Sequence, residues 1–519
     1  MTYAAAVPMS PVSPSRAGTE SRATHLYVMV AACAAIVYLG ALWNRFAFDD
    51  VAIVVMNPLV GHLSGLWKAF AAPYWTPDLG GSMYRPLTIA TFAVDRAVDG
   101  AAWLHAVNLA WHAAASVAVA ALARRWTNNA GALAAGLLFA VHPVHVEAVA
   151  NVVGRAESMA ALFAVLAVYA AVIHESVAWS TVAAVLGLLS KENAAVVPGL
   201  VVWAWLLGFG RPNRRRIVVF VTVWVVVGAA YVAVRAAVRH PFSGLEGTAL
   251  MFVGESPVAV RLTAVAGLAD VARLLVFPLT LRADYSPNER TLVTSPLDPR
   301  VVAGAVCFVV WSTLLFVAWK RGRRLEALGL GWIGIAYLPV ANLLYPVGFY
   351  LAERTLYLPS AGLVLAVGPW LERLPPRSFR VVVVALVVLG GVRTARRVPV
   401  WRDEPSLTLS MLQDSPRSFQ GPKRMAFWYL DQHEPTKALA AARLATSIFD
   451  RDATVYITGA VAAFAAGDAR AADSLLVGFQ RLCHQCPRYY RGSAAAAREA
   501  GYAAASDSLL ARAERIGGP

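Results

Sequence analysis

Long apolar runs separated by short polar loops make up most of the chain. A helix needs about 20 apolar residues to cross the hydrocarbon core of a membrane. Several of the runs are short or interrupted by Gly and Pro, which packed membrane helices tolerate. The pattern predicts an all-α, polytopic membrane helix bundle with about eleven spans. The predicted spans are 26–43, 103–123, 130–148, 157–174, 178–194, 195–209, 217–236, 300–319, 326–345, 356–372 and 379–395.

The segment 257–281 does not fit this pattern cleanly. It is apolar enough to cross, but Asp270 and Arg273 interrupt it. If it crossed fully, every later segment would change sides. We interpret it as interfacial or re-entrant, or as one half of a broken pair of helices, because the distribution of basic loops then stays consistent.

The hydrophobic pattern also sets the domain boundaries. Residues 1–23 are polar with Pro and Ser, and we expect them to be disordered. The span 26–43 is interpreted as retained, since no small-residue cleavage site of a signal peptide follows it. The transmembrane domain covers 24–401, and its two large loops are 44–102 and 237–299.

The segment 402–519 is Ala-rich, has helical spacing of apolar residues and lacks a membrane-length run. Asp473-Ser474-Leu475-Leu476 recurs 34 residues later as Asp507-Ser508-Leu509-Leu510. Tyr456 and Tyr490 share this offset, as do Gly467 and Gly501. Because 34 residues is the period of tetratricopeptide helix pairs, we predict about two and a half degenerate units of that kind. The alternative is a generic Ala-rich helical bundle.

Composition supports a membrane protein. Of the 519 residues, 58% are hydrophobic and only 15% are charged, which excludes an ordinary soluble globular protein. A net charge of +15 would suggest nucleic-acid binding in a soluble chain. Here most clustered arginines flank apolar runs, so we interpret them as orientation signals and expect no nucleic-acid partner.

Five basic clusters determine the predicted orientation. If the N-terminus is cytoplasmic, all five lie in the cytoplasm, and Asp49, Asp50 and the segment 402–519 lie outside. The group Arg393, Arg396 and Arg397 is the exception to this charge rule. The five clusters are Arg16 with Arg22, Arg124 with Arg125, Arg211 with Arg214, Arg215 and Arg216, Lys320 with Arg321, Arg323 and Arg324, and Arg373 with Arg377 and Arg380.

Four cysteines are too few for a disulfide framework. Cys483 and Cys486 form a C-x-x-C pair, which is a weak zinc signal without a second pair. Outside the cytoplasm the two could form a local disulfide, and the alternative is that both are plain helix residues.

Asp49 and Asp50 follow the first span directly. Charge close to hydrocarbon is costly, so a paired acid there suggests a function. The pair could supply a general base or, with a divalent cation, a metal ligand. The structural alternative is a helix N-cap or a charge that reaches back to the membrane surface.

Further polar groups lie in the predicted outer loops. His142, His145 and Glu147 do not have the H-E-x-x-H zinc spacing, so we favour polar contacts with substrate. We expect the outer cations to form a pocket for an anionic lipid headgroup, as guanidinium and ammonium groups bind phosphate. Internal Lys–Glu pairing is the alternative for Lys191. The full candidate set beyond the Asp pair is Arg85, His142, His145, Glu147, Arg155, Glu157, Lys191, Glu192, Glu353 and Arg354.

These motifs together resemble the transmembrane and tetratricopeptide-repeat-containing family. The resemblance covers roughly residues 40–415, and its longest block is His-Pro-Val-His-x-Glu through Gly-Arg-Ala-Glu. The Trp401-Arg402-Asp403-Glu404 motif resembles the family's junction to its repeats. The remaining stretches are Phe-x-Phe-Asp-Asp at 46–50, Tyr-Arg-Pro-Leu-Thr at 84–88, Leu-Ser-Lys-Glu at 189–192 and Ala-Glu-Arg-x-Leu-Tyr-Leu-Pro-Ser at 352–360.

The resemblance implies a GT-C glycosyltransferase fold, similar to protein O-mannosyltransferases that use a polyprenyl phosphate sugar donor and a secreted protein acceptor. Asp49 or Asp50 would then be the base, and Arg85, Arg155, Lys191 and Arg354 would contact the donor phosphate. The Ala/Val/Arg-rich composition indicates a bacterial inner membrane and an undecaprenyl carrier, with the site and the C-terminal segment on the periplasmic side. The short repeat segment departs from the family's long arrays.

Three alternatives stay open at this point. The acceptor could be a lipid or a glycan. A transporter would place its polar residues near the membrane midplane, in repeated halves, which the sequence does not show. An assembly scaffold would bind a partner protein through its repeats and would not need the acidic pair.

Overall fold

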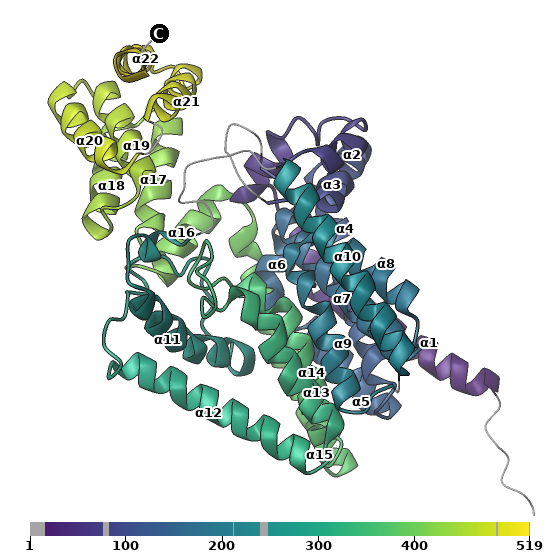
Figure 1. The fold of residues 1–519 in the computed structure, drawn as a ribbon. Helices are drawn as coiled ribbons and strands as arrows, with labels where there is room; N and C mark the ends of the chain where they lie inside the picture. Colours follow the sequence, from purple (N-terminus) through teal and green to yellow (C-terminus); the bar gives the residue numbers. More distant parts are fainter. Residues whose placement is uncertain (1–15, 76–82, 211, 239–247, 484–485, 518–519) are drawn as a thin grey trace, which may run out of the picture.

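The computed structural model describes residues 16–75, 83–210, 212–238, 248–483 and 486–517. These ranges contain helices and no strand, which confirms the all-α prediction. A bundle of long helices carries a group of shorter helices at one end (Figure 1). The helices are α1 (Arg16–Val37), α2 (Gly65–Lys68), α3 (Pro86–Val98), α4 (Ala101–Ala123), α5 (Asn129–Ala140), α6 (Val146–Ala150), α7 (Arg155–Val172), α8 (Val177–Ser190), α9 (Val197–Leu206), α10 (Arg214–Val238), α11 (Pro257–Val276), α12 (Pro299–Lys320), α13 (Arg324–Tyr337), α14 (Tyr357–Leu371), α15 (Pro376–Arg397), α16 (Glu404–Asp414), α17 (Gln420–Asp431), α18 (Pro435–Ile448), α19 (Ala453–Ala465), α20 (Ala469–Leu482), α21 (Cys486–Glu499) and α22 (Ala503–Gly517).

A helix stands at each of the eleven predicted spans, but the span count stays a prediction. Among the described residues five helices are long and apolar enough to cross a membrane, or six if the bent α5–α6 segment is one span. This segment bends by 46° at His142-Pro143. Proline disfavours helix in the residue before it, so α5 ends there and a 3-10 turn, η4 (Pro143–His145), follows. Helix α1 begins at Arg16, inside the segment expected to be disordered, and residues 1–15 lie outside the described ranges.

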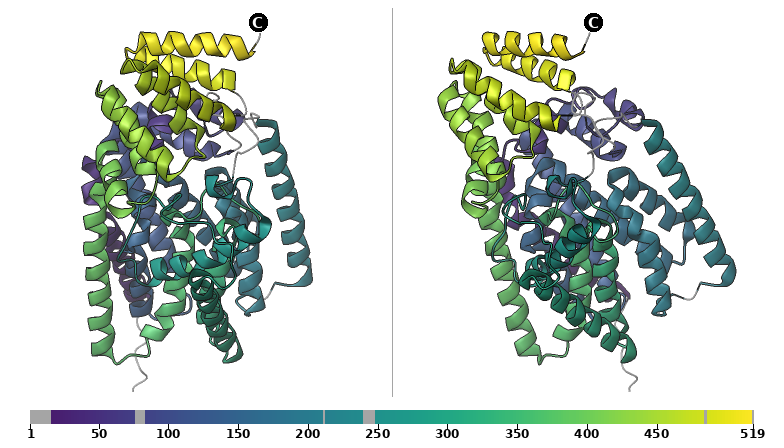
Figure 2. Two further views of the ribbon diagram at one scale, coloured as in Figure 1. Left: turned by 90° about the vertical axis from the view of Figure 1, so that its left-hand side faces the viewer. Right: turned by 60° about the vertical axis from the view of Figure 1, so that its left-hand side comes forward.

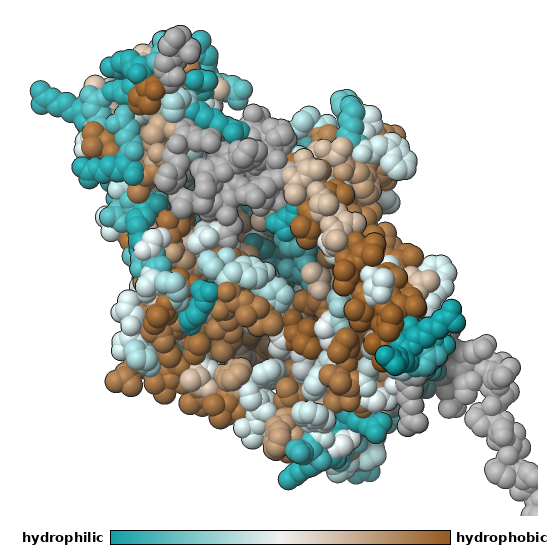
Figure 3. Space-filling view, viewed as in Figure 1, coloured by the Kyte–Doolittle hydropathy of each residue, from teal (hydrophilic) through white to brown (hydrophobic). Residues whose placement is uncertain are grey.

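Three helices present apolar surface outward. Only 11% of the apolar window of α10 is buried, and 17% of those of α12 and α15. Apolar residues cover the flank of the bundle in Figure 3, whereas the C-terminal helices and the opposite tip are hydrophilic. Such a band of exposed Val, Leu and Phe needs a lipid environment, because water would make it an aggregation surface.

Helix α11 occupies the segment whose path the sequence leaves open. On its N-terminal side, the carbonyl of Val253 accepts a hydrogen bond from Arg451 of the C-terminal domain. At its C-terminal end, the carbonyl of Leu275 is 3.0 Å from His142 Nε2. Both neighbours lie at the same end of the bundle, so α11 does not run the length of the bundle. This agrees with the interfacial or re-entrant interpretation.

The C-terminal helices form three antiparallel pairs stacked beyond the bundle (Figure 2). First helices begin at 420, 453 and 486, and second helices at 435, 469 and 503, a spacing of 33 or 34 residues. The turn inside each pair contains one residue with positive φ, which is His433, Gly467 or Gly501. The recurring geometry extends the offset found in the sequence to three units. Assignment to the tetratricopeptide class stays a prediction.

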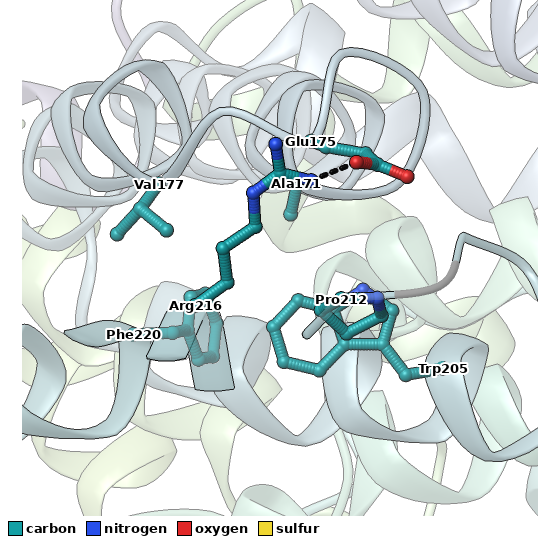
Figure 4. A pocket seen from close by; sticks show the side chains of 7 residues that line it. All are labelled: Ala171, Glu175, Val177, Trp205, Pro212, Arg216 and Phe220. Carbon is teal, nitrogen blue, oxygen red and sulfur yellow. Dashed lines mark hydrogen bonds and ion pairs between the residues drawn. The ribbon is translucent and has the colours of Figure 1, made fainter. Parts of the chain in front are cut away.

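The two ends of the bundle differ in charge. The basic clusters with described residues lie where α4, α12 and α14 end and where α10, α13 and α15 begin, opposite the C-terminal helices. One of them closes a small pocket in which Arg216 pairs with Glu175 beside Trp205 and Phe220 (Figure 4). The exceptional group of Arg393 and Arg397 lies at the other end. There Arg393 donates to the Leu279 carbonyl and Arg397 pairs with Asp414 of α16.

Candidate active site at one end of the helix bundle

The candidate residues come from helix ends that meet at the end carrying the C-terminal domain. Asp49 lies between α1 and α3, where it begins a short helical turn that continues into η2 (Val51–Val55), and Arg85 is the residue before α3. Glu147 lies on α6, and Lys191 joins α8 to the turn η6 (Glu192–Val196). Arg354 lies on the turn η9 (Glu353–Leu356), just before α14. Segments far apart in sequence are therefore brought together by antiparallel packing of the helices that they terminate.

Three ion pairs form the wall of the site. Arg354 pairs with Glu147 through its guanidinium, and its backbone N–H donates to the same carboxylate at 2.9 Å. Lys191 pairs with Glu157, which also accepts from Asn193 at 3.1 Å. Arg85 pairs with Glu192 through Nε at 2.9 Å and Nη2 at 2.5 Å, a bidentate geometry. Every candidate cation in this wall is thus neutralised by a carboxylate.

Exposure distinguishes the three cations. The side chains of Arg85 and Lys191 are each 9% exposed, whereas that of Arg354 is 28% exposed. The cations expected to form a pocket for an anionic headgroup therefore stand in a charge-balanced wall, and Lys191 is paired with a glutamate as its alternative interpretation predicted. An incoming anion reaches Arg354 most readily, because that guanidinium still presents surface to solvent.

The two adjacent aspartates differ sharply. Asp50 is 1% exposed, and both of its oxygens accept backbone N–H groups, from Val153 at 2.8 Å and from Ala47 and Val152 at 3.3 Å. Asp50 therefore ties its loop to the turn before α7. Asp49 is half-buried, and no described residue donates a hydrogen bond to its carboxylate. Only Asp49 keeps its lone pairs available to a substrate.

The surroundings of Asp49 adjust its acidity. Burial raises the pKa of the Asp49 carboxyl above its ordinary value, while the charges of Arg354 and Arg424 oppose that increase. Glu147 raises the same pKa, and Arg85 lowers it. For Asp50, burial raises the pKa to about 7, although its three amide hydrogen bonds act in the opposite direction. An acceptor of protons with an elevated pKa is suited to general-base catalysis near neutral pH.

Arg155 does not join this wall, although we assigned it to the donor phosphate from sequence. Its side chain is fully buried, and its guanidinium pairs with Asp95. It also donates to Asn108 Oδ1 at 2.7 Å and to the Leu104 carbonyl at 2.9 Å. With these partners Arg155 holds α3, α4 and α7 together, and a substrate phosphate has no access to it.

Three further candidates are also bonded within the protein rather than directed at the wall. His142 contacts the Leu275 carbonyl as described, and the buried His145 lies 2.7 Å from Ser360 Oγ. Glu353 accepts from the Arg282 N–H at 2.6 Å and from the Tyr285 hydroxyl at 2.8 Å. Burial raises the pKa of Glu353 to about 7. These three residues connect the segments around the site through hydrogen bonds within the protein.

A divalent cation held by the protein would need several oxygen or nitrogen ligands that converge on one point. Among the described residues, no group of three or more His, Cys, Asp or Glu side chains gathers as a metal site requires. Asp50, one of the two candidate ligands, has both oxygens engaged by amides. The aspartate pair therefore does not fit a divalent cation held by protein ligands alone.

The C-terminal domain contributes residues near Asp49 that were not among the candidates predicted from sequence. Arg424 of α17 lies 4.3 Å from the centroid of the Phe48 ring and pairs with Glu404 of α16. Glu404 lies in the Trp401-Arg402-Asp403-Glu404 motif, which carries part of the family resemblance. This motif could have identified Glu404 as a candidate from the sequence. No sequence feature identified Arg424, because it lies in a segment interpreted only as helical repeats.

Cys483 and Cys486, whose pairing the sequence left open, form a disulfide.

Comparison with curated proteins gives relatives over most of the chain. A Protein O-mannosyl-transferase of Caenorhabditis elegans, F38B6.6, is 29% identical over 78% of this chain and 60% of its own length. Protein O-mannosyl-transferase TMTC4 of Homo sapiens is 28% identical over 75% of the chain and 62% of its own length. TMTC3 of Mus musculus is 27% identical over 75% of the chain. The similarity to transmembrane and tetratricopeptide-repeat-containing proteins expected from the motifs is confirmed.

The chain spans only part of these relatives, about half of mouse TMTC3 and about 60% of the worm protein. No protein-family model matches the chain, and no solved structure is significantly similar to it.

Proposed function

We propose that this chain is a membrane glycosyltransferase that transfers a sugar, with mannose as the first choice, to a hydroxyl of a protein. The names of the relatives support the reaction class and the protein acceptor. The observation that carries the proposal within the chain is Asp49, an unbonded, half-buried carboxylate beside the accessible Arg354. The GT-C fold type expected from the resemblance is part of this proposal.

The proposed donor is a polyprenyl phosphate sugar. Arg354, the most exposed wall cation, would contact its phosphate. An apolar groove of about 930 Å³ between α11, α12, α13 and α14 offers a place for the isoprenoid chain. It extends from Arg323 at the basic end to Leu343, which lies eleven residues before Arg354 in sequence. A wall that is already charge-balanced would accept a single phosphate charge by exchanging a carboxylate contact.

The geometry supports a single displacement. The acceptor hydroxyl oxygen attacks the anomeric carbon, its proton passes to Asp49, and the bond from the anomeric carbon to the phosphate oxygen breaks. The polyprenyl phosphate leaves with the bonding electrons, and Arg354 stabilises the charge that develops on it. The leaving phosphate needs no protonating acid. Because one carboxylate acts as base and no covalent intermediate forms, the anomeric configuration inverts.

Two other functions are less well supported. A lipid or glycan acceptor would use the same wall and base, and only product analysis separates it from a protein acceptor. A transporter or a passive scaffold would not require an unbonded carboxylate next to an accessible guanidinium. The C-terminal domain is proposed to contact acceptor or partner protein.

The orientation is testable with reporter fusions. We propose that Asp49 faces the outside of a bacterial inner membrane and that the basic end is cytoplasmic. A reporter active only outside the cytoplasm, inserted after residue 62, should be active, and one inserted after residue 322 should be silent. Reversal of both signals would refute the proposed side of catalysis.

The Arg354→Ala variant is expected to weaken donor use. Loss of one charged phosphate contact should raise the donor KM by about tenfold or more, equivalent to roughly 1.5–3 kcal/mol, with a smaller change in acceptor KM. Initial rates measured in membranes against each substrate test this. Arg373→Ala is the matched control, because Arg373 also pairs with a glutamate, Glu326, but at the basic end. An unchanged donor KM would reject the phosphate role.

The reaction itself is tested by incubating membranes with a panel of polyprenyl phosphate sugars and analysing proteins, lipids and glycans by mass spectrometry. Sugar on Ser or Thr of a protein is the expected product. Sugar found only on lipid or glycan would replace the acceptor assignment, and no transfer from any donor would reject the function.

A further inference from the structure

The residue before the proposed base has a strained backbone. Phe48 has φ of +59°, in the left-handed region that residues with a side chain rarely adopt. Such a conformation is unfavourable and persists only where surrounding contacts hold it. Because Phe48 and Asp49 share a peptide bond, whatever holds Phe48 also sets the direction of the Asp49 side chain.

The contacts that hold Phe48 come from the junction and the C-terminal domain. The Phe48 N–H donates to Glu404 Oε2 at 2.9 Å, and the other oxygen of Glu404 pairs with Arg424. The Arg424 guanidinium lies over the Phe48 ring. Trp401 meets the same ring edge-on, with centroids 6.4 Å apart and planes at 88°. Backbone, ring, carboxylate and guanidinium thus form a closed set of contacts around one residue, here termed the Phe48 clamp.

A second connection lies three residues earlier. The Arg45 N–H donates to the Arg402 carbonyl at 2.7 Å, and the Arg45 carbonyl is 3.0 Å from His105 Nε2. The loop carrying Asp49 is therefore fixed between α4 on one side and the C-terminal domain on the other. The membrane bundle alone leaves one side of this loop without its partners.

Arg424 acts on Asp49 electrostatically as well. Besides the adjacent Asp50, the charged groups with the largest influence on the Asp49 carboxyl come from several parts of the fold. They are Arg354 on η9, Arg424 on α17, Glu147 on α6 and Arg85 before α3. Arg424 is the one supplied by the C-terminal domain, and its charge lowers the pKa of Asp49.

We propose that Glu404 and Arg424 are positioning residues that orient the Asp49 carboxylate through the Phe48 clamp, so that the C-terminal domain completes the active site. The inference rests on the proposed role of Asp49 as base and deepens it. The domain then does more than contact acceptor protein, since displacement of α16 or α17 would move the base.

The test compares Arg424→Met with Arg424→Lys in the full chain. Loss of the charge should lower kcat by about ten- to a hundredfold through misplacement of the base, with little change in donor KM. It should also move the acid limb of the kcat/KM profile to higher pH, because Asp49 is a base only above its pKa. Arg424→Lys keeps the charge and should leave the limb near its original position. Arg512→Met, which breaks the ion pair with Asp473 within the same domain, should change neither quantity.

A second measurement does not need transferase activity. Carbodiimides react with protonated carboxyls, so labelling of Asp49 as a function of pH, followed by peptide mass spectrometry, reports its titration directly. The midpoint should rise in Arg424→Met and stay in Arg424→Lys and Arg512→Met. If the wild-type chain shows no transfer but the Asp49 midpoint still rises in Arg424→Met, the proposed function is refuted and the clamp stays supported. An unshifted midpoint in well-folded Arg424→Met would overturn the clamp, whatever the activity.

Discussion

Asp49→Asn is expected to lower transfer by about 10²–10⁴-fold, the contribution that a positioned general base makes. The substitution keeps the size of the side chain and removes only its ability to take the acceptor proton. Because no described residue bonds to the Asp49 carboxylate, the change leaves no internal donor without its partner. Stability of the purified protein should therefore be unchanged. Rates with saturating donor, normalised to folded protein, are the measurement.

Asp50→Asn provides the contrast for that experiment. It replaces an acceptor of three backbone hydrogen bonds by a group that is partly a donor, next to Val152 and Val153. We expect a loss of about 1–3 kcal/mol in stability, with less folded protein but near-normal activity per folded molecule. The sequence left open which of the two aspartates would be the base. Full activity in Asp49→Asn would remove the base assignment.

Arg155→Leu is expected to destabilise the bundle by about 3–5 kcal/mol, because it leaves Asp95 buried without its partner. The carbonyl of Leu104 and the side chain of Asn108 lose their donor as well. The amount of monodisperse protein after heating in detergent measures the effect.

The double variant Arg155→Leu with Asp95→Leu separates the two possible roles of Arg155. Replacing both charges with apolar groups should restore much of the stability, since the uncompensated charge is then gone. If Arg155 instead contacts the donor phosphate, the double variant would be stable and still show a raised donor KM. A normal donor KM in the stable double variant is the expected result.

The apolar pattern predicted a helix at each of the eleven expected spans, and a helix is found at each. Apolar runs reveal membrane-length helices directly, since lipid requires every backbone polar group to be satisfied within the helix. The 34-residue offset likewise indicated the helix pairs, because each repeat needs a turn at the same place. Residues that terminate these helices, among them Asp49, Lys191 and Arg354, were found as candidates because charge is conspicuous beside apolar runs.

Roles within the candidate set could not be read in the same way. Asp49 and Asp50 are identical neighbours in sequence, yet one is bonded to three amides and the other to none. Arg155 and Arg354 each stand in a motif that carries the family resemblance, yet the first is enclosed by α3 and α4. Which partner each charge meets depends on helix packing between segments 60 to 207 residues apart.

By itself, then, the sequence determined an all-helical chain with apolar spans, a repeating C-terminal segment and a set of charged helix ends, since local periodicity and hydropathy act within each segment. Tertiary structure alone decided which acid is left unbonded, which cation is accessible, and that Glu404 and Arg424 reach Phe48. The reason is that hydrogen bonds and ion pairs are saturable. A charge that is both paired and fully buried, such as that of Arg155, is out of reach of a substrate, and only the packed helices determine which charges are enclosed in this way.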